Sequence, residues 1–101
     1  MRAITITYAY CGDETDWQNA VDAFVSALDA DKELGGRFSY QVAVADDKET
    51  RIHWGRWDSA ETLAHVQSQP YFKEFAGKVR EFAGGAPTAT GHDIVTKTGN
   101  W

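Results

Sequence analysis

The segment Arg51–Phe75, RIHWGRWDSAETLAHVQSQPYFKEF, decides the fold. Its first residues, up to Trp57, are rich in β-branched and aromatic side chains and predict a strand. Asp58 then opens a helix as its N-cap, with Glu61 placed to bond back to the cap. Pro70 interrupts that helix and starts a second one as its first residue. A strand followed by two consecutive helices therefore stands at the centre of the sequence.

Two further strands precede this segment. Residues 37–45 alternate between apolar and polar side chains, which predicts a strand. The polar turn at residues 46–48 joins it to the strand of the central segment, residues 49–57, so the two strands are expected to form a hairpin. Residues 3–10 alternate in the same way and predict the first strand of the chain. One face of the 37–45 strand is expected to carry Phe38, Tyr40, Val42 and Val44.

A helix is expected between the first strand and the hairpin. Thr15 and Gln18 fit a capping box at its start, and it ends before Gly35-Gly36. The helix that begins at Pro70 ends at Gly84-Gly85, and residues 88–97 predict a fourth strand. The apolar stripes of the two helices are Val21, Phe24, Val25 and Leu28, and Phe72, Phe75, Val79 and Phe82.

The element order is β-α-β-β-α-β, which is typical of an α+β, ferredoxin-like fold with an antiparallel four-stranded sheet and helices on one face. A chain of 101 residues makes one domain, residues 1–101. Trp54 and Trp57 have opposite parity in their strand, so both sheet faces need cover. A second subunit is the economical cover, which predicts a homodimer. The alternative is that Trp57 lies past the strand end and packs on the helix.

Composition excludes several classes of protein. Lys and Arg number 10 against 15 Asp and Glu, and this net charge of -5 argues against nucleic-acid or anionic-membrane binding. No segment approaches the roughly 20 apolar residues of a membrane helix, and the alternating N-terminus lacks a signal-peptide core, so a cytoplasmic protein is expected. Cys11 is the single cysteine, which rules out an intrachain disulfide, and no Cys/His cluster has zinc spacing.

The central segment resembles the antibiotic biosynthesis monooxygenase-like family of the dimeric α/β-barrel superfamily. The family pattern has a strand ending in an aromatic, an acidic or small helix start, a mid-helix histidine, and a Ser- or Pro-containing break before an aromatic pair. Nearly the whole chain shares the element order. The matching residues here are Trp57, Asp58-Ser59, His65, Ser68 and Tyr71-Phe72.

The resemblance implies a homodimer whose two sheets close into a barrel, with a pocket between sheet and helices in each subunit. Some members of the family oxidise aromatic polyketides with molecular oxygen and no cofactor or metal, and others degrade haem. Gly55 stands where many members carry a glutamate. The position of the haem-ligating histidine falls near Ala76, so haem ligation there loses its chemical basis and we reject that activity.

Two histidines are the candidate catalytic residues. An oxygenase without a cofactor must deprotonate a phenol or enol, and an imidazole has a pKa suited to that step. His53 lies mid-strand, where the missing side chain of Gly55 is expected to leave room for a ligand. His65 lies in the short helix before Pro70. A structural role stays open for both, as a sheet or interface histidine and a helix-surface histidine, and His92 is expected to be structural.

Five residues are the candidate substrate-binding set. Aromatic rings at Trp54, Trp57, Tyr71 and Tyr40 can stack on an aromatic ligand, and Arg51 can anchor an anion. The alternative is that these rings form the core and that the arginine is solvated or salt-bridged.

Two functions remain open at this level. The first is a cofactor-independent oxygenase that acts on a small aromatic or enolisable compound and uses no cofactor or metal. The second is a non-catalytic dimeric protein that binds a small hydrophobic molecule or serves as a stress-response accessory protein. Packed histidines without a cavity would count against the first function, and a converging His-Tyr-Arg set in a ligand-sized pocket would count against the second.

Overall fold

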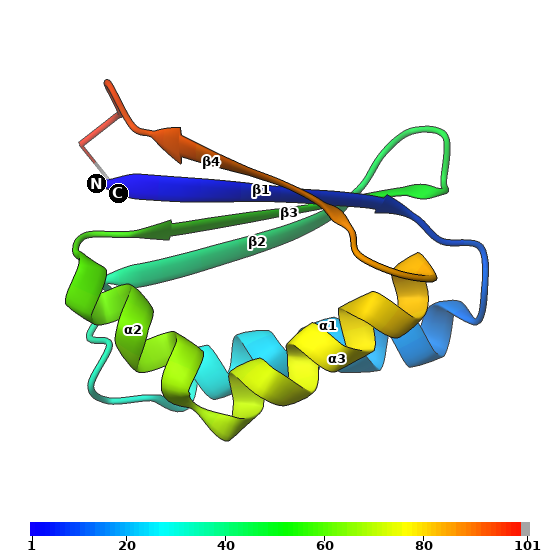
Figure 1. Cartoon of the computed structure of the whole chain (residues 1–101), viewed down its shortest axis with the longest axis horizontal. Helices are drawn as coiled ribbons and strands as arrows, with labels where there is room; N and C mark the ends of the chain where they lie inside the picture. Colours follow the sequence, from blue (N-terminus) through cyan, green and yellow to red (C-terminus); the bar gives the residue numbers. More distant parts are fainter. Residues whose placement is uncertain (100–101) are drawn as a thin grey trace.

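The chain folds into a four-stranded antiparallel sheet with three helices, as the computed structural model shows for residues 1–99 (Figure 1). The strand order is β2-β3-β1-β4, so β2 and β4 are the edges. The predicted ferredoxin-like α+β arrangement is confirmed. The elements are β1 (Arg2–Ala9), α1 (Glu14–Ala30), β2 (Phe38–Val44), β3 (Thr50–Trp57), α2 (Ala60–Ser68), α3 (Pro70–Ala83) and β4 (Thr88–Asp93).

All three helices lie on one side of the sheet, and the other side carries none among the described residues (Figure 1). The two central tryptophans take opposite faces, as their parity predicts. Trp57 ends β3 on the helix side, where its ring stacks with Phe38 at a centroid distance of 6.0 Å. Trp54 lies on the open face and stacks with His92 at 5.9 Å. No helix in residues 1–99 is long and apolar enough to cross a membrane.

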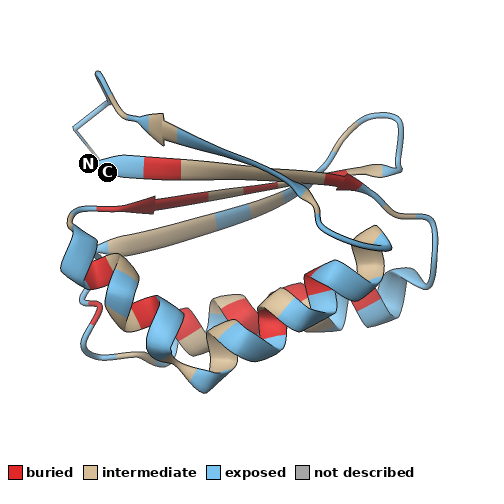
Figure 2. Ribbon diagram, in the orientation of Figure 1, coloured by how far each residue is buried: buried red, intermediate tan, exposed pale blue. Residues whose placement is uncertain are grey.

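Aromatic rings fill the centre of the layer between sheet and helices. Phe24 of α1 and Phe75 of α3 stack face to face, with centroids 4.1 Å apart. The Tyr40 ring of β2 meets both edge-on, at 4.9 and 5.9 Å. Buried residues on the inner sides of the helices extend this core along the sheet (Figure 2). Further buried members are Val21, Leu28, Leu34, Val66 and Val79.

Both predicted helix caps are displaced by one or two residues. The N-cap of α1 is Asp13, whose side chain accepts a hydrogen bond from the Asp16 N–H, so the prediction of Thr15 is wrong. An aspartate ranks above threonine at this position. The N-cap of α2 is Ser59, and Asp58 instead accepts a 2.6 Å hydrogen bond from the Thr62 hydroxyl.

Strand β4 is shorter than predicted, because it ends at Asp93 instead of residue 97. Its partner β1 begins at Arg2, which pairs with Asp93, and a single backbone hydrogen bond from the Ile94 N–H to the Met1 carbonyl follows this pair. Ile94 and Thr96 consequently do not share a strand face with His92. Trp101, which the sequence left without an assignment, lies outside the described residues.

The space expected beside Gly55 for a ligand is occupied by the chain itself. A Cβ at Gly55 would lie 3.1 and 3.2 Å from two carbons of the Tyr40 ring. That contact is tighter than ordinary van der Waals packing. The prediction of ligand room at Gly55 is therefore wrong, because the tyrosine of the neighbouring strand fills it.

We expect Gly55→Ala to lower the free energy of unfolding by about 1 to 3 kcal/mol, since the Tyr40 ring must shift to admit the methyl group. Gly77→Ala is the matched control. Nothing lies within 4 Å of a Cβ at Gly77 in α3, and the substitution should stabilise the helix by up to about 1 kcal/mol. Urea denaturation of the three proteins measures both effects. Equal stability of the Gly55→Ala protein and the wild type would show that the ring is not tightly held.

Candidate functional site

A chain of polar side chains crosses the interior from α1 to the edge strand β2. His53 of β3 is fully buried, and its Nε2 lies 2.8 Å from the Tyr8 hydroxyl. Its Nδ1 lies 2.8 Å from the Tyr40 hydroxyl. The Trp17 indole N–H donates to the Tyr8 hydroxyl at 2.9 Å. We call Trp17, Tyr8, His53 and Tyr40 the buried polar chain.

Strand pairing explains why these four side chains meet. Ile6 of β1 pairs with His53, which places Tyr8 two residues further along the same face. Val42 of β2 is the partner of His53 on the other side, so Tyr40 also lies two residues away on that face. The imidazole thus stands between two tyrosines supplied by its two neighbouring strands.

The buried polar chain carries no net charge at neutral pH. Burial lowers the pKa of His53 to about 4, because the imidazolium form loses its hydration. The same loss of hydration raises the pKa of Tyr8 and of Tyr40. The ring is therefore a neutral imidazole flanked by two neutral phenols.

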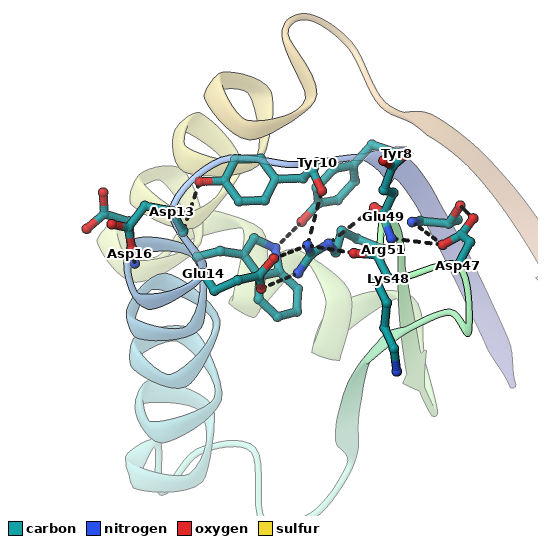
Figure 3. A network of polar contacts seen from close by, with 11 residues as sticks. Tyr8, Tyr10, Asp13, Glu14, Asp16, Asp47, Lys48, Glu49 and Arg51 are labelled. Carbon is teal, nitrogen blue, oxygen red and sulfur yellow. Dashed lines mark hydrogen bonds and ion pairs between the residues drawn. The ribbon is translucent and has the colours of Figure 1, made fainter.

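Arg51 lies beside Trp17, at one end of the buried polar chain, within a network of polar contacts (Figure 3). Its fully buried guanidinium makes two hydrogen bonds to the Glu14 carboxylate, at 2.9 and 2.5 Å, and stacks on the Trp17 ring at 4.4 Å. This pairing lowers the pKa of Glu14. Main-chain carbonyls of Tyr10, Lys48 and Glu49 accept its remaining hydrogen bonds. Arg51 is thus held by the chain's own groups, in keeping with the salt-bridged alternative.

A groove of about 410 Å³ lies between α1 and β2. Trp17 and Tyr40, the first and last members of the chain, both line it. Asp22 of α1 adds a carboxylate, which accepts a hydrogen bond from the Gln18 amide at 3.0 Å. The rest of the lining is Gln18, Val21, Val25, Gln41, Val42 and Val44.

His65 belongs to a separate cluster at the C-terminal end of α1. Its Nε2 lies 2.8 Å from Asp31 Oδ2, and the Tyr71 hydroxyl donates to the same oxygen at 2.8 Å. Both contacts lower the pKa of Asp31, while burial and the nearby carboxylate raise that of Tyr71. Glu33 approaches the other ring nitrogen at 3.1 Å. A hollow of about 110 Å³ adjoins His65.

The remaining candidates lie elsewhere. Trp54 lines a hollow of about 430 Å³ on the open sheet face, together with His92 and residues 93–98. Trp57 packs on Phe38 at the far end of β3. The structure thus brings His53, Tyr40 and Arg51 into one region, pairs His65 with Tyr71 in a second, and separates both tryptophans from these.

Sequence reasoning passed over two residues of the groove. Trp17 extends the stripe of Val21 and Phe24 by one turn, and this helical spacing was the available signal. Asp22 lies off the apolar stripe of this helix, and it is exposed while also lining the groove. Within residues 1–99, no group of three or more His, Cys, Asp or Glu side chains is arranged to hold a metal ion.

Comparison with known proteins rests on structure. No protein-family model matches the sequence, and no curated protein matches it. Rv0793 from Mycobacterium tuberculosis has a TM-score of 0.77 at 15% identity, covering 95% of this chain and 96% of its own. An antibiotic biosynthesis monooxygenase has a TM-score of 0.74 at 11% identity, covering 95% and 100%.

A variant of SnoaB, a cofactor-independent oxygenase from Streptomyces nogalater, has a TM-score of 0.70 at 11% identity, with coverage of 96% and 94%. At these identities the likeness establishes the fold. The fold is that of the antibiotic biosynthesis monooxygenase-like structures, so the predicted resemblance is confirmed at this level.

We expect the neutral state of His53 to show in the pH dependence of stability. The folded pKa of about 4 lies below the unfolded value near 6.5. Between these pH values the unfolded chain binds a proton that the folded chain does not, so the free energy of unfolding falls as the pH drops through this window. The loss amounts to about 3 kcal/mol and is absent above pH ~6.5.

Urea denaturation at stepped pH, compared between the wild type and His53→Gln, isolates this contribution from that of the carboxylates. NMR titration of the His53 ring in the wild type gives the folded pKa directly. A midpoint near the unfolded value would contradict the burial argument.

Proposed function

We propose that the protein is a cofactor-independent oxygenase of a small aromatic or enolisable compound, which binds in the groove between α1 and β2. One observation carries the proposal: a buried polar chain centred on a neutral imidazole ends at Tyr40, a residue that lines a groove of about 410 Å³. Clefts of this size are typical of small-molecule sites. The structural likeness to SnoaB, named a cofactor-independent oxygenase, supports the same reaction class.

The reaction needs an electron-rich substrate carbon next to an oxygen function. A base removes a proton from that carbon, and the resulting carbanion transfers an electron to molecular oxygen. Recombination forms a C–O bond to a hydroperoxide, which then loses water. A substrate CH2 and O2 become C=O and H2O, so the carbon is oxidised, oxygen is reduced, and no external reductant is needed.

The groove offers groups for both ends of that step. Asp22 is the carboxylate that takes the proton, and Tyr40 is the residue that holds the substrate oxygen. His53 does not touch the substrate in this proposal, because both of its nitrogens are occupied by tyrosine hydroxyls. It acts as a positioning residue that orients the Tyr40 hydroxyl. Trp17 and Val42 form apolar walls.

Dense packing beneath the groove supports a second function, in which the protein binds a small hydrophobic molecule without transforming it. The stacked rings of Phe24 and Phe75 meet Tyr40 edge-on, and His53 is fully buried, so a ligand is confined to the outer groove. Binding without oxygen consumption would identify this function.

We expect oxygen uptake when the purified protein meets a panel of hydroxylated anthrones and naphthols, measured with an oxygen electrode in the presence of a chelator. Tyr40→Phe and Asp22→Asn should each lower kcat/KM by about 10²-fold or more. Tyr10→Phe is the matched control, because the Tyr10 hydroxyl donates to the Asp13 carbonyl outside the groove. Circular dichroism confirms folding. No uptake with any compound, together with ligand binding, would replace this function by the second.

We also propose that two copies pair through the open sheet face. This face carries the partly buried Ile52 and Trp54 beside the buried Ala3, and no described helix covers it. Large apolar side chains on an uncovered sheet favour a partner surface.

Sedimentation at micromolar concentration should give twice the chain mass of 11.2 kDa. Trp54→Glu should shift the protein to monomer, because a carboxylate would enter the contact, and Lys73→Glu on the helix layer should not. A wild-type monomer would contradict the pairing.

A further inference from the structure

His65 of α2 faces a carboxylate with each of its two ring nitrogens. Its Nε2 lies 2.8 Å from Asp31 Oδ2, and its Nδ1 lies 3.1 Å from Glu33 Oε2. An ionised carboxylate only accepts hydrogen bonds, so each nitrogen must donate a hydrogen to make one. A neutral imidazole carries one N–H and an imidazolium carries two. Both contacts can therefore be hydrogen bonds only while the ring is positively charged.

The two carboxylates differ in how far water can reach them. The Asp31 side chain is 12% exposed, whereas the Glu33 side chain is 77% exposed. Asp31 is the C-cap of α1, where the helix carbonyls already place negative charge, so its carboxylate depends on nearby donors. Besides the ring these are the Tyr71 hydroxyl at 2.8 Å and the Glu33 N–H at 3.1 Å. Together they lower the pKa of Asp31, and the bond from His65 contributes most.

This difference in exposure decides which contact survives when the ring loses one hydrogen. If Nε2 lost it, a nitrogen lone pair would face Asp31 Oδ2 at 2.8 Å where little water can enter, and an unsatisfied polar contact of this kind costs free energy. If Nδ1 lost it, the exposed Glu33 carboxylate could turn into solvent and accept hydrogen bonds from water. The neutral ring thus keeps Asp31 and gives up Glu33.

The main chain of the connection between α1 and β2, residues 31–37, is held independently of the ring. The Arg37 Nε donates to the Leu34 carbonyl at 3.1 Å, and its Nη2 donates to the Glu33 carbonyl. The Leu34 side chain is buried in the core. The Glu33 side chain is consequently the part of this connection that can move away from His65.

Three further titratable groups surround the ring. Arg37 and Glu61 line the hollow of about 110 Å³ beside His65, and the Tyr71 hydroxyl shares Asp31 with it. Arg37 and Glu61 carry opposite charges, so they act on the charge of the ring in opposite directions. Tyr71 stays neutral, because burial and the Asp31 carboxylate raise its pKa. The response of the ring to pH is therefore read out by the two carboxylates that it contacts.

We propose that His65 is a pH-operated latch between α2 and the end of α1. With two hydrogens the ring joins both Asp31 and Glu33, and with one it holds Asp31 alone and releases Glu33 from the hollow. A fall in pH closes the latch and a rise in pH opens it. None of these residues lines the groove between α1 and β2, so the latch does not depend on the proposed oxygenase activity.

Ring ¹⁵N NMR of the protein labelled at histidine tests the latch at pH ~5.5 and ~8.5, on either side of the ordinary histidine range. At the lower pH we expect both ring nitrogens of His65 to carry hydrogen. At the higher pH we expect Nε2–H with a bare Nδ1. His65→Gln assigns the signals by their loss. A hydrogen on Nδ1 of the neutral ring, or a neutral ring at the lower pH, would overturn the proposal.

A double-mutant cycle of His65→Gln and Glu33→Gln, measured by urea denaturation at the same two pH values, tests the release of Glu33. At the lower pH we expect the two substitutions to interact by about two- to fivefold in the unfolding equilibrium constant, the worth of an exposed ion pair. At the higher pH the interaction should be lost. Glu81→Gln is the matched control, because it removes an exposed carboxylate near the opposite end of α3 from Tyr71 and should not interact with His65→Gln at either pH.

Two results of the cycle would overturn the latch. An interaction of equal size at both pH values would mean that Glu33 stays on the ring after the hydrogen is lost. No interaction at either pH would mean that the ring does not bind Glu33 at all. Should His65→Gln not fold, His53→Gln and His92→Gln assign the other two histidines, and the wild-type spectra still decide the tautomer.

Discussion

A polar ring buried at the centre of a sheet must have a partner at each nitrogen, and the interior of this protein is built around that requirement. His53 is fully excluded from water, where an unpaired ring nitrogen would cost free energy. Its partners come from both neighbouring strands, so the registers of β1 and β2 against β3 are fixed together. Trp17 ties the same network to α1. One buried imidazole thus links three strands and a helix.

The same requirement shapes the candidate site. Burial keeps the ring neutral and the two tyrosines fix its position. The ring is connected to the groove between α1 and β2 through Tyr40 and, by way of Tyr8, through Trp17. Arg51 and Glu14 hold the neighbouring corner by a charged pair, with the guanidinium stacked on Trp17. The residues that sequence reasoning grouped as one pocket therefore divide between a packed interior, a helix-end cluster around His65, and the open sheet face.

Much of the fold follows from periodicity, and little of the site does. Alternation placed the strands, and the parity of Trp54 and Trp57 correctly assigned them to opposite faces. The ends of the strands depend on their pairing partners in the sheet. Strand β4 ends at Asp93, opposite Arg2, the first residue of β1. The space at Gly55 could not be judged from the sequence, since the ring that fills it comes from another strand. Which tyrosines reach His53 likewise depends on strand register, which local patterns leave open.

The central claim is that Tyr8 and Tyr40 act on each other through the ring of His53, which lies between their hydroxyls. A double-mutant cycle of Tyr8→Phe and Tyr40→Phe, measured by urea denaturation at pH 7, tests this most directly. Coupled hydrogen bonds predict an interaction free energy of at least about 0.5 kcal/mol, because removing one hydroxyl changes which proton the ring presents to the other. Effects that add to within about 0.3 kcal/mol would mean that the hydroxyls act independently and would contradict the account.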